Sequence, residues 1–273
     1  MIQDHSAGLT DVGKQRDGNE DALLLDDENR LYVVADGMGG HQAGEVASGI
    51  VIDTFSSCII HGGGTKTVTF PDATLSMEAN ELLACIREAN SKVFEKSQND
   101  ETCRGMGSTV AALYCSDSTI IAANVGDSPI FLIRDGEPEL ISVMHTVAAE
   151  QAAIDPNRLK NIAEKYLHML SRAIGVAREV TPDVCETDCF PGDTIVLCSD
   201  GLSNLVVPGE IADIVGRHMP EAACRELVDL ANERGGTDNI TVIVVRIEED
   251  GSLQKGLRGF FMKVLAALKV RFH

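Results

Sequence analysis

Short apolar runs, separated by glycine-rich polar turns, divide the chain into strands and helices. Short runs rich in β-branched and aromatic residues are typical of strands, whereas apolar residues at intervals of three and four are typical of helices. On these grounds we expect strands at residues 7–12, 22–25, 31–35, 109–115, 119–125, 129–134, 139–143, 181–190, 194–199 and 240–247.

Four amphipathic or apolar segments are expected to be helices, at residues 43–60, 73–96, 208–217 and 221–233. Residues 145–176 have a polar helical pattern that Pro156 divides in two, and a segment of this kind between strands is a natural lid over a site. The strands between residues 109 and 143 are separated by hairpin turns, so we expect an antiparallel meander there and not an alternating βαβ pattern.

The chain has 273 residues and a net charge of −19, which argues against a nucleic-acid partner because Lys and Arg make most contacts with a phosphate backbone. Its eight cysteines are scattered, so we expect buried free thiols in a reducing cytosol and not a zinc site. Residues 1–5 are not a basic region leading into an apolar one, and apolar runs are shorter than the ~20 residues of a membrane span. We therefore expect a cytoplasmic protein.

Residues 31–41 are the stretch to which the other candidate site residues are compared. Its apolar run ends at Asp36, and three glycines stand among the next four residues. A strand that presents a carboxylate and then omits side chains can admit a hard cation or a phosphate close to the backbone. An ordinary strand followed by a glycine-rich turn would look the same.

Three further acids share this setting, because Asp127, Asp200 and Asp238 also stand at expected strand ends beside or near glycine. Four such carboxylates repel one another unless a cation neutralises them, and Mg²⁺ and Mn²⁺ prefer oxygen ligands. Two such ions about 3.5–4 Å apart can share a carboxylate and hold a hydroxide that attacks phosphorus. Arg16 is available to hold the phosphate through a bidentate contact.

The chain closely resembles the PP2C-type metal-dependent protein phosphatases in their bacterial form. Six short motifs follow in the family's order with matching spacing, and together they span nearly all of residues 6–250. The motifs are residues 13–21, 34–41, 105–109, 124–128, 199–202 and 236–241.

The resemblance implies an α+β fold, a four-layer αββα sandwich of two central antiparallel β-sheets flanked by helices. It implies that Asp36 bridges two Mn²⁺ or Mg²⁺ ions and that the Gly37 carbonyl binds one of them. Asp200 and Asp238 would bind the other ion. Asp127, with help from Asp200, would hold a weaker third ion.

The same resemblance assigns roles to the residues around these ligands. Glu20 and Asp21 match acids that act mainly through metal-bound waters, and Arg16 matches the arginine that holds the substrate phosphate. Asn239 is expected to support the site from outside the ligand set. His41 is the nearest candidate for a catalytic proton donor, because Met38 stands where animal members often have a histidine.

Two other departures concern the surroundings of the expected metal ligands. Pro129 occupies a place where arginine is common, and residues 144–146 read Met-His-Thr in place of Asp-His-Ser. The metal-binding acids are intact, whereas the lid that shapes substrate choice is unusual. We therefore expect activity, with a specificity that differs from the common type.

Beyond residue 250 the character of the chain changes. Residues 252–273 contain five Lys or Arg and no acid, and their apolar residues recur at helical spacing. We divide the chain into a catalytic domain at residues 1–250 and a basic amphipathic tail at residues 251–273. Such a tail can contact an anionic membrane surface or a partner, which leaves open a peripheral location at the inner membrane face, or it can pack against its own acidic domain.

The expected function is hydrolysis of phosphoserine and phosphothreonine in proteins by a hydroxide that bridges two metal ions, without a phosphoenzyme. Its substrates would be phosphorylated proteins made by a Ser/Thr kinase. The alternative is a catalytically silent module of the same fold that binds a phosphorylated regulator. Its expected signature, loss of metal-binding acids, is absent from the sequence.

Overall fold

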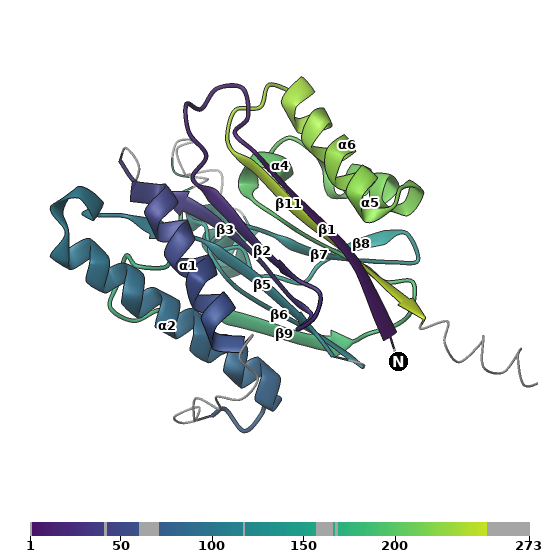
Figure 1. The fold of residues 1–273 in the computed structure, drawn as a ribbon, viewed down its shortest axis with the longest axis horizontal. Coiled ribbons are helices and arrows are strands. Elements are labelled where there is room, and N and C mark those ends of the chain that lie inside the picture. The colour runs from purple at the N-terminus through teal and green to yellow at the C-terminus, as the bar shows by residue number, and fades with distance from the viewer. Residues whose placement is uncertain are drawn as a thin grey trace, which may run out of the picture.

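The fold is that of a computed structural model which describes residues 2–40, 43–59, 71–116, 118–156, 166 and 169–249. Two antiparallel sheets lie face to face, with helices on both outer sides (Figure 1). The four layers confirm the α+β sandwich expected from the sequence.

The first sheet has the strand order β1-β11-β10-β7-β8, and the second has the order β2-β3-β5-β6-β9 with β4 paired to β3. Every pairing between neighbouring strands is antiparallel. The first and last of the described strands, β1 and β11, pair along their whole length, so the two ends of the described chain lie side by side. The strands are β1 Ile2–Asp11, β2 Asp21–Asp26, β3 Leu31–Met38, β4 Gly107–Ser108, β5 Val110–Cys115, β6 Thr119–Val125, β7 Ile130–Arg134, β8 Glu137–Leu140, β9 Asp183–Asp188, β10 Thr194–Cys198 and β11 Ile240–Glu249.

Helices cover the outer face of each sheet, and this arrangement produces three separate apolar cores. The two longest helices pack on the second sheet, two shorter ones pack on the first, and the third core lies between the sheets. The helices are α1 Ala43–Ile59, α2 Met77–Asn99, η1 Glu101–Cys103, α3 Val147–Ile154, α4 Asp200–Ser203, α5 Pro208–Arg217 and α6 Pro220–Glu233. Among these described helices, none is long and apolar enough to cross a membrane.

The meander expected at residues 109–143 is wrong. β5 and β6 pair within the second sheet, whereas β7 and β8 belong to the first. The chain crosses between the sheets at residues 126–129, where Gly126 adopts a φ of +108° and Pro129 has no backbone N–H to donate. The crossing places Asp127 at the junction of the two sheets.

The lid is also less helical than expected. In the described part of residues 145–176, only α3 is an α-helix, and Pro156 follows its C-cap at Asp155. Residues 169–176 instead form turns and isolated bridges, one of which joins Thr146 to Leu170. The backbone of this stretch pairs with Ser108 of β4 and with Thr146 before α3, and that tertiary pairing overrides the local helical pattern.

Several element ends differ from the sequence-based expectation for local reasons. α2 begins at Met77 and not at residue 73, because the Ser76 hydroxyl caps it by accepting the Ala79 N–H over 3.1 Å. β3 continues past Ala35 to Met38, because its last residues pair with β4. The short helix α4, which starts at Asp200, was not predicted.

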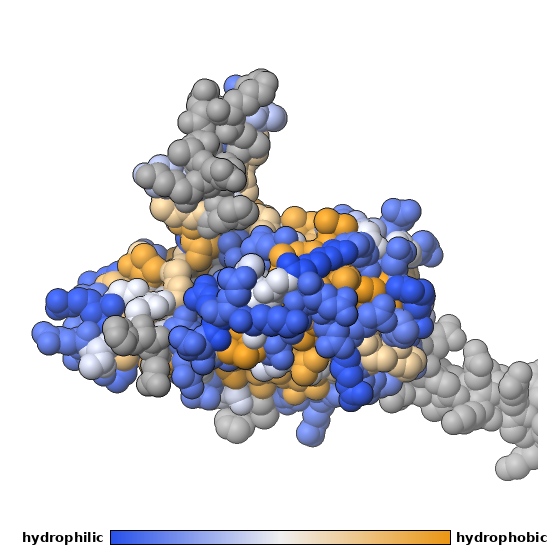
Figure 2. All heavy atoms as spheres, turned by 90° about the horizontal axis from the view of Figure 1, so that it is seen from above, coloured by the Kyte–Doolittle hydropathy of each residue, from blue (hydrophilic) through white to orange (hydrophobic). Residues whose placement is uncertain are grey.

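The described cysteines are free thiols, and most of them are buried, as expected. Burial raises the pKa of Cys198 and, to about 12, that of Cys224. Each of the three cores contains two buried cysteines: Cys85 and Cys103, Cys198 and Cys224, and Cys115 and Cys189. The face seen in Figure 2 is mostly hydrophilic with apolar patches between, in keeping with the acidic composition.

Candidate metal centre and active site

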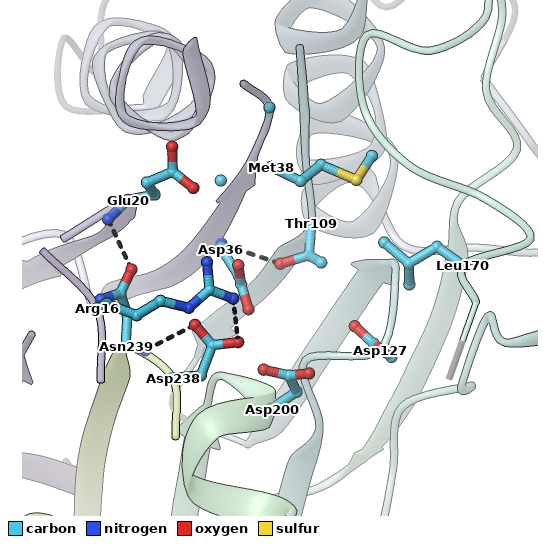
Figure 3. Close-up of a pocket in the computed structure, with 12 residues that line it drawn as sticks. Arg16, Glu20, Asp36, Met38, Thr109, Asp127, Leu170, Asp200, Asp238 and Asn239 are labelled. Atoms are coloured by element: carbon cyan, nitrogen blue, oxygen red, sulfur yellow. Dashed lines mark hydrogen bonds and ion pairs between the residues drawn. The ribbon is translucent and has the colours of Figure 1, made fainter. Parts of the chain in front are cut away.

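A pocket of about 230 Å³ opens where the two sheets meet, and carboxylates form much of its lining (Figure 3). Asp36 comes from β3, Asp127 from the crossing between the sheets, Asp200 from the start of α4 and Asp238 from the turn before β11. Glu20, from the turn before β2, completes the acidic lining. Both sheets therefore contribute acids to one pocket.

The acids of this pocket are short of positive charge. Burial, and after it the negative charges of neighbouring aspartates, raise the pKa of Asp36 well above its usual value. Burial and the charge of Asp200 raise the pKa of Asp127 to about 7. These carboxylates stay fully ionised at neutral pH only if a cation compensates their charge.

Asp36 is held through its backbone by Thr109. Its N–H donates to the Thr109 hydroxyl over 3.0 Å, and its carbonyl accepts the Thr109 N–H over 2.8 Å. The Thr109 hydroxyl also lies 2.7 Å from that of Ser128, just beyond Asp127. Thr109 therefore connects the backbones on which Asp36 and Asp127 stand.

The glycine at Gly37 is required by helix packing. A Cβ there would lie 2.1 Å from the carbonyl oxygen of Gly44 and 2.6 Å from that of Glu20, a separation that real atoms do not tolerate. The Gly37 N–H donates to the Glu20 carbonyl over 3.1 Å. The close approach inferred from sequence thus exists, and the start of α1 and the Glu20 turn are the protein parts that make it; binding of a ligand by the Gly37 carbonyl stays a prediction.

Arg16 brings a positive charge to the rim of the pocket. Its Nη2 lies 2.7 Å from Oδ2 of Asp238, and its side chain is 49% exposed. The hydrogen bond to Asp238, followed by the charges of Asp238, Glu20 and Asp36, raises the pKa of Arg16, so the guanidinium stays charged. Because half of the side chain is exposed, Arg16 can exchange Asp238 for an incoming anion.

Asn239 fastens the turn that carries Arg16 and Glu20. Its amide nitrogen donates to the carbonyls of Val12 and Gly18, over 3.0 and 2.9 Å, and its Oδ1 accepts the Glu20 N–H over 2.8 Å. The side chain is buried, so these three bonds hold residues 12–20 against the start of β11.

The donor set suits a hard divalent cation. Buried carboxylate oxygens of Asp21, and Oε1 of Glu20, lack hydrogen-bond partners, which is costly unless another positive group compensates them. Carboxylate and carbonyl oxygens are the ligands that Mg²⁺ and Mn²⁺ prefer. Within the described ranges, no three acidic, histidine or cysteine side chains already stand in a metal-binding arrangement. The carboxylates of this pocket repel one another, and Arg16 is the one basic residue among the described residues of its lining. The residues present fit the ions, whose binding would draw the carboxylates together.

A model of the family described as "Protein phosphatase 2C" matches residues 7–240. The chain belongs to the protein phosphatase 2C family. The match confirms the resemblance seen in the motifs and the enzyme class, a phosphoprotein phosphatase of the serine/threonine type.

Bacterial PP2C proteins are similar over almost the whole chain. The protein phosphatase PhpP of Streptococcus pneumoniae is 34% identical over 249 residues, which are 89% of this chain and 97% of PhpP. The serine/threonine phosphatase stp of Listeria monocytogenes serotype 4b is 34% identical over 262 residues, 92% of this chain and 98% of the relative.

Solved PP2C structures share the fold. The Mycobacterium tuberculosis serine/threonine phosphatase PstP/Ppp superposes with a TM-score of 0.77 at 30% identity, covering 91% of this chain and 100% of the solved chain. The catalytic domain of PstP has also been solved in complex with two manganese ions. The Mycobacterium smegmatis phosphatase MsPP, solved with cacodylate, gives a TM-score of 0.74 at 32% identity over 89% of this chain and 97% of the solved chain.

Most of the residues predicted for the PP2C site come together in the structure. One pocket is lined by Arg16, Glu20, Asp36, Gly37, Asp127, Asp200, Asp238 and Asn239. Asp21 does not line it but is buried beside Asp36, its partner across the β2–β3 pair, and burial raises its pKa to about 6. His41 lies outside the described residues. The individual roles in metal and phosphate binding stay predictions.

Two lining residues were missed by sequence reasoning. Thr109 lies within a recognised motif, but its hydrogen bond to the Asp36 backbone depends on the pairing of β3 with β5 and left no local signal. Leu170 reaches the pocket from the lid, more than 40 residues beyond Asp127 in the sequence. Met38 also lines the pocket, so the position that differs from animal members faces the site.

Proposed function

We propose that this chain is a Mn²⁺- or Mg²⁺-dependent protein serine/threonine phosphatase that reverses the action of a Ser/Thr protein kinase. The observation that carries the proposal is the convergence of acids from both sheets, with one arginine at the rim, on one pocket. The chemistry that Mn²⁺ or Mg²⁺ supplies in such a pocket is activation of water at neutral pH and neutralisation of phosphate charge. The order of the four acids and their PP2C relatives support two ions, with Asp127 available for a weaker third.

The chain's own residues account for ligand binding and substrate orientation. We assign Asp36, Asp200 and Asp238 as direct carboxylate ligands and the Gly37 carbonyl as a further ligand. Glu20 and Asp21 have oxygens without partners, so they are suited to hold waters around the ions. These assignments give every buried carboxylate of the pocket a positive or hydrogen-bonding counterpart.

Arg16 is assigned to the substrate phosphate. A guanidinium offers a planar pair of donors that matches two phosphate oxygens, and Arg16 already donates one hydrogen bond, from Nη2, to the Asp238 carboxylate at the rim. Exchange of Asp238 for phosphate would orient the phosphoryl group above the acids. Met38 has no proton to donate, and His41 remains the proposed donor to the leaving oxygen.

The test is hydrolysis of p-nitrophenyl phosphate and of phosphoserine, phosphothreonine and phosphotyrosine peptides. We expect turnover with Mn²⁺ that a chelator abolishes, a preference for phosphoserine and phosphothreonine peptides, and a loss of at least 100-fold in Asp36→Asn and Asp238→Asn. The matched control is Asp213→Asn, at an exposed aspartate of α5, which should keep normal turnover.

Two outcomes would contradict the proposal. Folded protein that binds Mn²⁺ but hydrolyses none of these substrates would favour the silent binding module. Turnover that survives Asp36→Asn would show that the acids do not form the reaction centre.

We further propose that residues 1–250 form the catalytic domain and that the tail at residues 251–273 makes a separate surface contact. The tail lies outside the described residues. The support for this proposal is its basic, amphipathic sequence. Co-sedimentation with anionic liposomes should fall when residues 252–273 are deleted. Unchanged binding would exclude the membrane contact and leave a protein partner or the acidic domain.

A further inference from the structure

His145 is a buried histidine that contacts Gly126 through both its ring and its backbone. Its side chain is 0% exposed. The Gly126 N–H donates to Nδ1 of His145 over 3.0 Å, and the His145 backbone N–H donates to the Gly126 carbonyl over 3.0 Å. One residue therefore holds both hydrogen-bonding groups of Gly126.

These contacts define the state of the ring. A backbone N–H can only donate, so Nδ1 must accept and the proton of the neutral ring lies on Nε2. Nε2 lies 2.8 Å from Oδ2 of Asp183, which accepts a hydrogen bond from the Nε2–H and another, over 2.7 Å, from Nη1–H of Arg172. Burial lowers the pKa of His145, which favours the neutral ring that this arrangement needs.

The position of Gly126 decides where the next residue points. Gly126 has a φ of +108°, and a Cβ would lie 2.6 Å from Cγ2 of Thr109. Glycine adopts many backbone conformations, so its own preference does not select this one. Contacts with His145 on one side and Thr109 on the other do select it, and Asp127 follows directly with its carboxylate in the pocket (Figure 3).

His145 also joins this backbone to the lid. Its carbonyl accepts the Ser171 N–H over 2.9 Å, and Arg172, the next residue, binds the Asp183 carboxylate that orients the ring. Leu170, on the other side of Ser171, lines the pocket. The chain Arg172–Asp183–His145–Gly126 therefore connects the lid to the residue before Asp127.

We propose that His145 is a positioning residue that fixes the Gly126 peptide and so presents Asp127 to a divalent cation. It acts through Gly126 and touches neither substrate nor metal. The inference rests on the proposed function, because the role of Asp127 as a ligand belongs to that proposal. His145 is the first residue of the lid, so the start of the lid also holds one ligand of the metal centre in place.

Two substitutions separate the two hydrogen bonds of the ring. In His145→Asn, the side-chain oxygen takes the place of Nδ1 and can still accept the Gly126 N–H, but the side chain is too short for Asp183. In His145→Gln, the amide reaches toward Asp183 as Nε2 does, but it leaves no acceptor for Gly126. His218→Gln is the control, because His218 is a surface histidine at the end of α5 that pairs with Glu226.

The readouts are Mn²⁺ titration calorimetry on the folded proteins, hydrogen exchange of the Gly126 amide, and the Mn²⁺ dependence of p-nitrophenyl phosphate turnover. Residues that orient metal ligands typically affect affinity by about 10- to 100-fold. We expect His145→Gln to weaken the weakest Mn²⁺ step at least tenfold and to speed exchange at Gly126. His145→Asn should stay within about threefold of the unmodified protein in both, and His218→Gln should not differ from it.

Equal Mn²⁺ affinities in the two His145 variants, whether or not both melt earlier, would overturn the inference and leave His145 a packing residue. Failure of the unmodified protein to bind Mn²⁺ would overturn it as well. Failure to turn over any phosphate while the calorimetric and exchange differences persist would refute the proposed function alone.

Discussion

Replacing Asn239 by alanine tests whether its side chain holds the turn that carries Arg16 and Glu20. The substitution removes three hydrogen bonds, to the Val12 carbonyl, the Gly18 carbonyl and the Glu20 N–H. Asn239 itself is only 4% exposed, so its own side chain is shielded from water.

The expected loss of stability follows from the surroundings of those partners. Each bond contributes about 1 kcal/mol, and a polar group left buried without a partner costs about 1–3 kcal/mol. Val12 and Gly18 are exposed residues, so water can replace the bonds to their carbonyls and the lower figure applies. We expect a loss of about 3 kcal/mol in the free energy of unfolding, or about 6–12 °C in melting temperature for a domain of this size.

The assay is urea unfolding followed by circular dichroism, with p-nitrophenyl phosphate turnover measured at a temperature where the variant is folded. Turnover should fall by raising KM more than by lowering kcat, because Arg16 loses its fixed position. Asn99→Ala, at an exposed residue ending α2, should change the free energy of unfolding by less than about 0.5 kcal/mol. An Asn239→Ala protein as stable as this control would refute the assignment of Asn239.

Three further predictions concern charge. The folded-state pKa values of Asp127 and Asp21, about 7 and about 6, lie above those of the unfolded chain, so the metal-free protein should lose stability as pH rises from about 4 to about 7. The measurement is the melting temperature over this pH range, in chelator and in saturating Mn²⁺. A melting temperature in chelator that rises with pH, or a fall that saturating Mn²⁺ does not reduce, would contradict this. Arg134→Ala should cost about 2 kcal/mol in urea unfolding, because it leaves Asp193, whose side chain is 2% exposed, without its bidentate partner, and adding Asp193→Asn should recover part of the loss. Arg16→Ala should lower kcat/KM at least about tenfold, while the melting temperature of the Mn²⁺-loaded protein hardly changes. The kcat/KM of Arg16→Lys should lie between those of Arg16→Ala and the unmodified protein, because lysine keeps the charge but lacks the planar pair of donors. Equal activity in the two variants would count against a bidentate phosphate contact.

The parts of the fold that were predictable are those with a local signature. Apolar runs that end at a carboxylate next to glycine mark Asp36, Asp127 and Asp200 as strand-end acids, and the structure brings all three to one pocket. The sheet to which each strand belongs has no local signature. β6 and β7 read as consecutive hairpin strands, yet the chain changes sheet between them, because pairing is decided by partners far away in sequence.

The site was predictable in its acids and in Asn239, but not in the other residues that hold the acids or in the contacts made. Thr109 and His145 fix backbones that are distant in sequence, and polar residues of these types are common on any protein surface. The identity of their partners depends on the finished packing of strands against loops. Gly37 illustrates the same limit, since its close contact was foreseen but the α1 backbone that makes it was not.

The two buried, free cysteines in each core can serve as chemical reporters of that core. Because the thiols of all three cores are buried, alkylating reagents can reach them only when that layer opens. Mass spectrometry of pulse-labelled protein would therefore show whether the outer helices detach before the two sheets separate. Cys198 and Cys224 report on the α5–α6 side, Cys85 and Cys103 on the α1–α2 side, and Cys115 and Cys189 on the interface between the sheets.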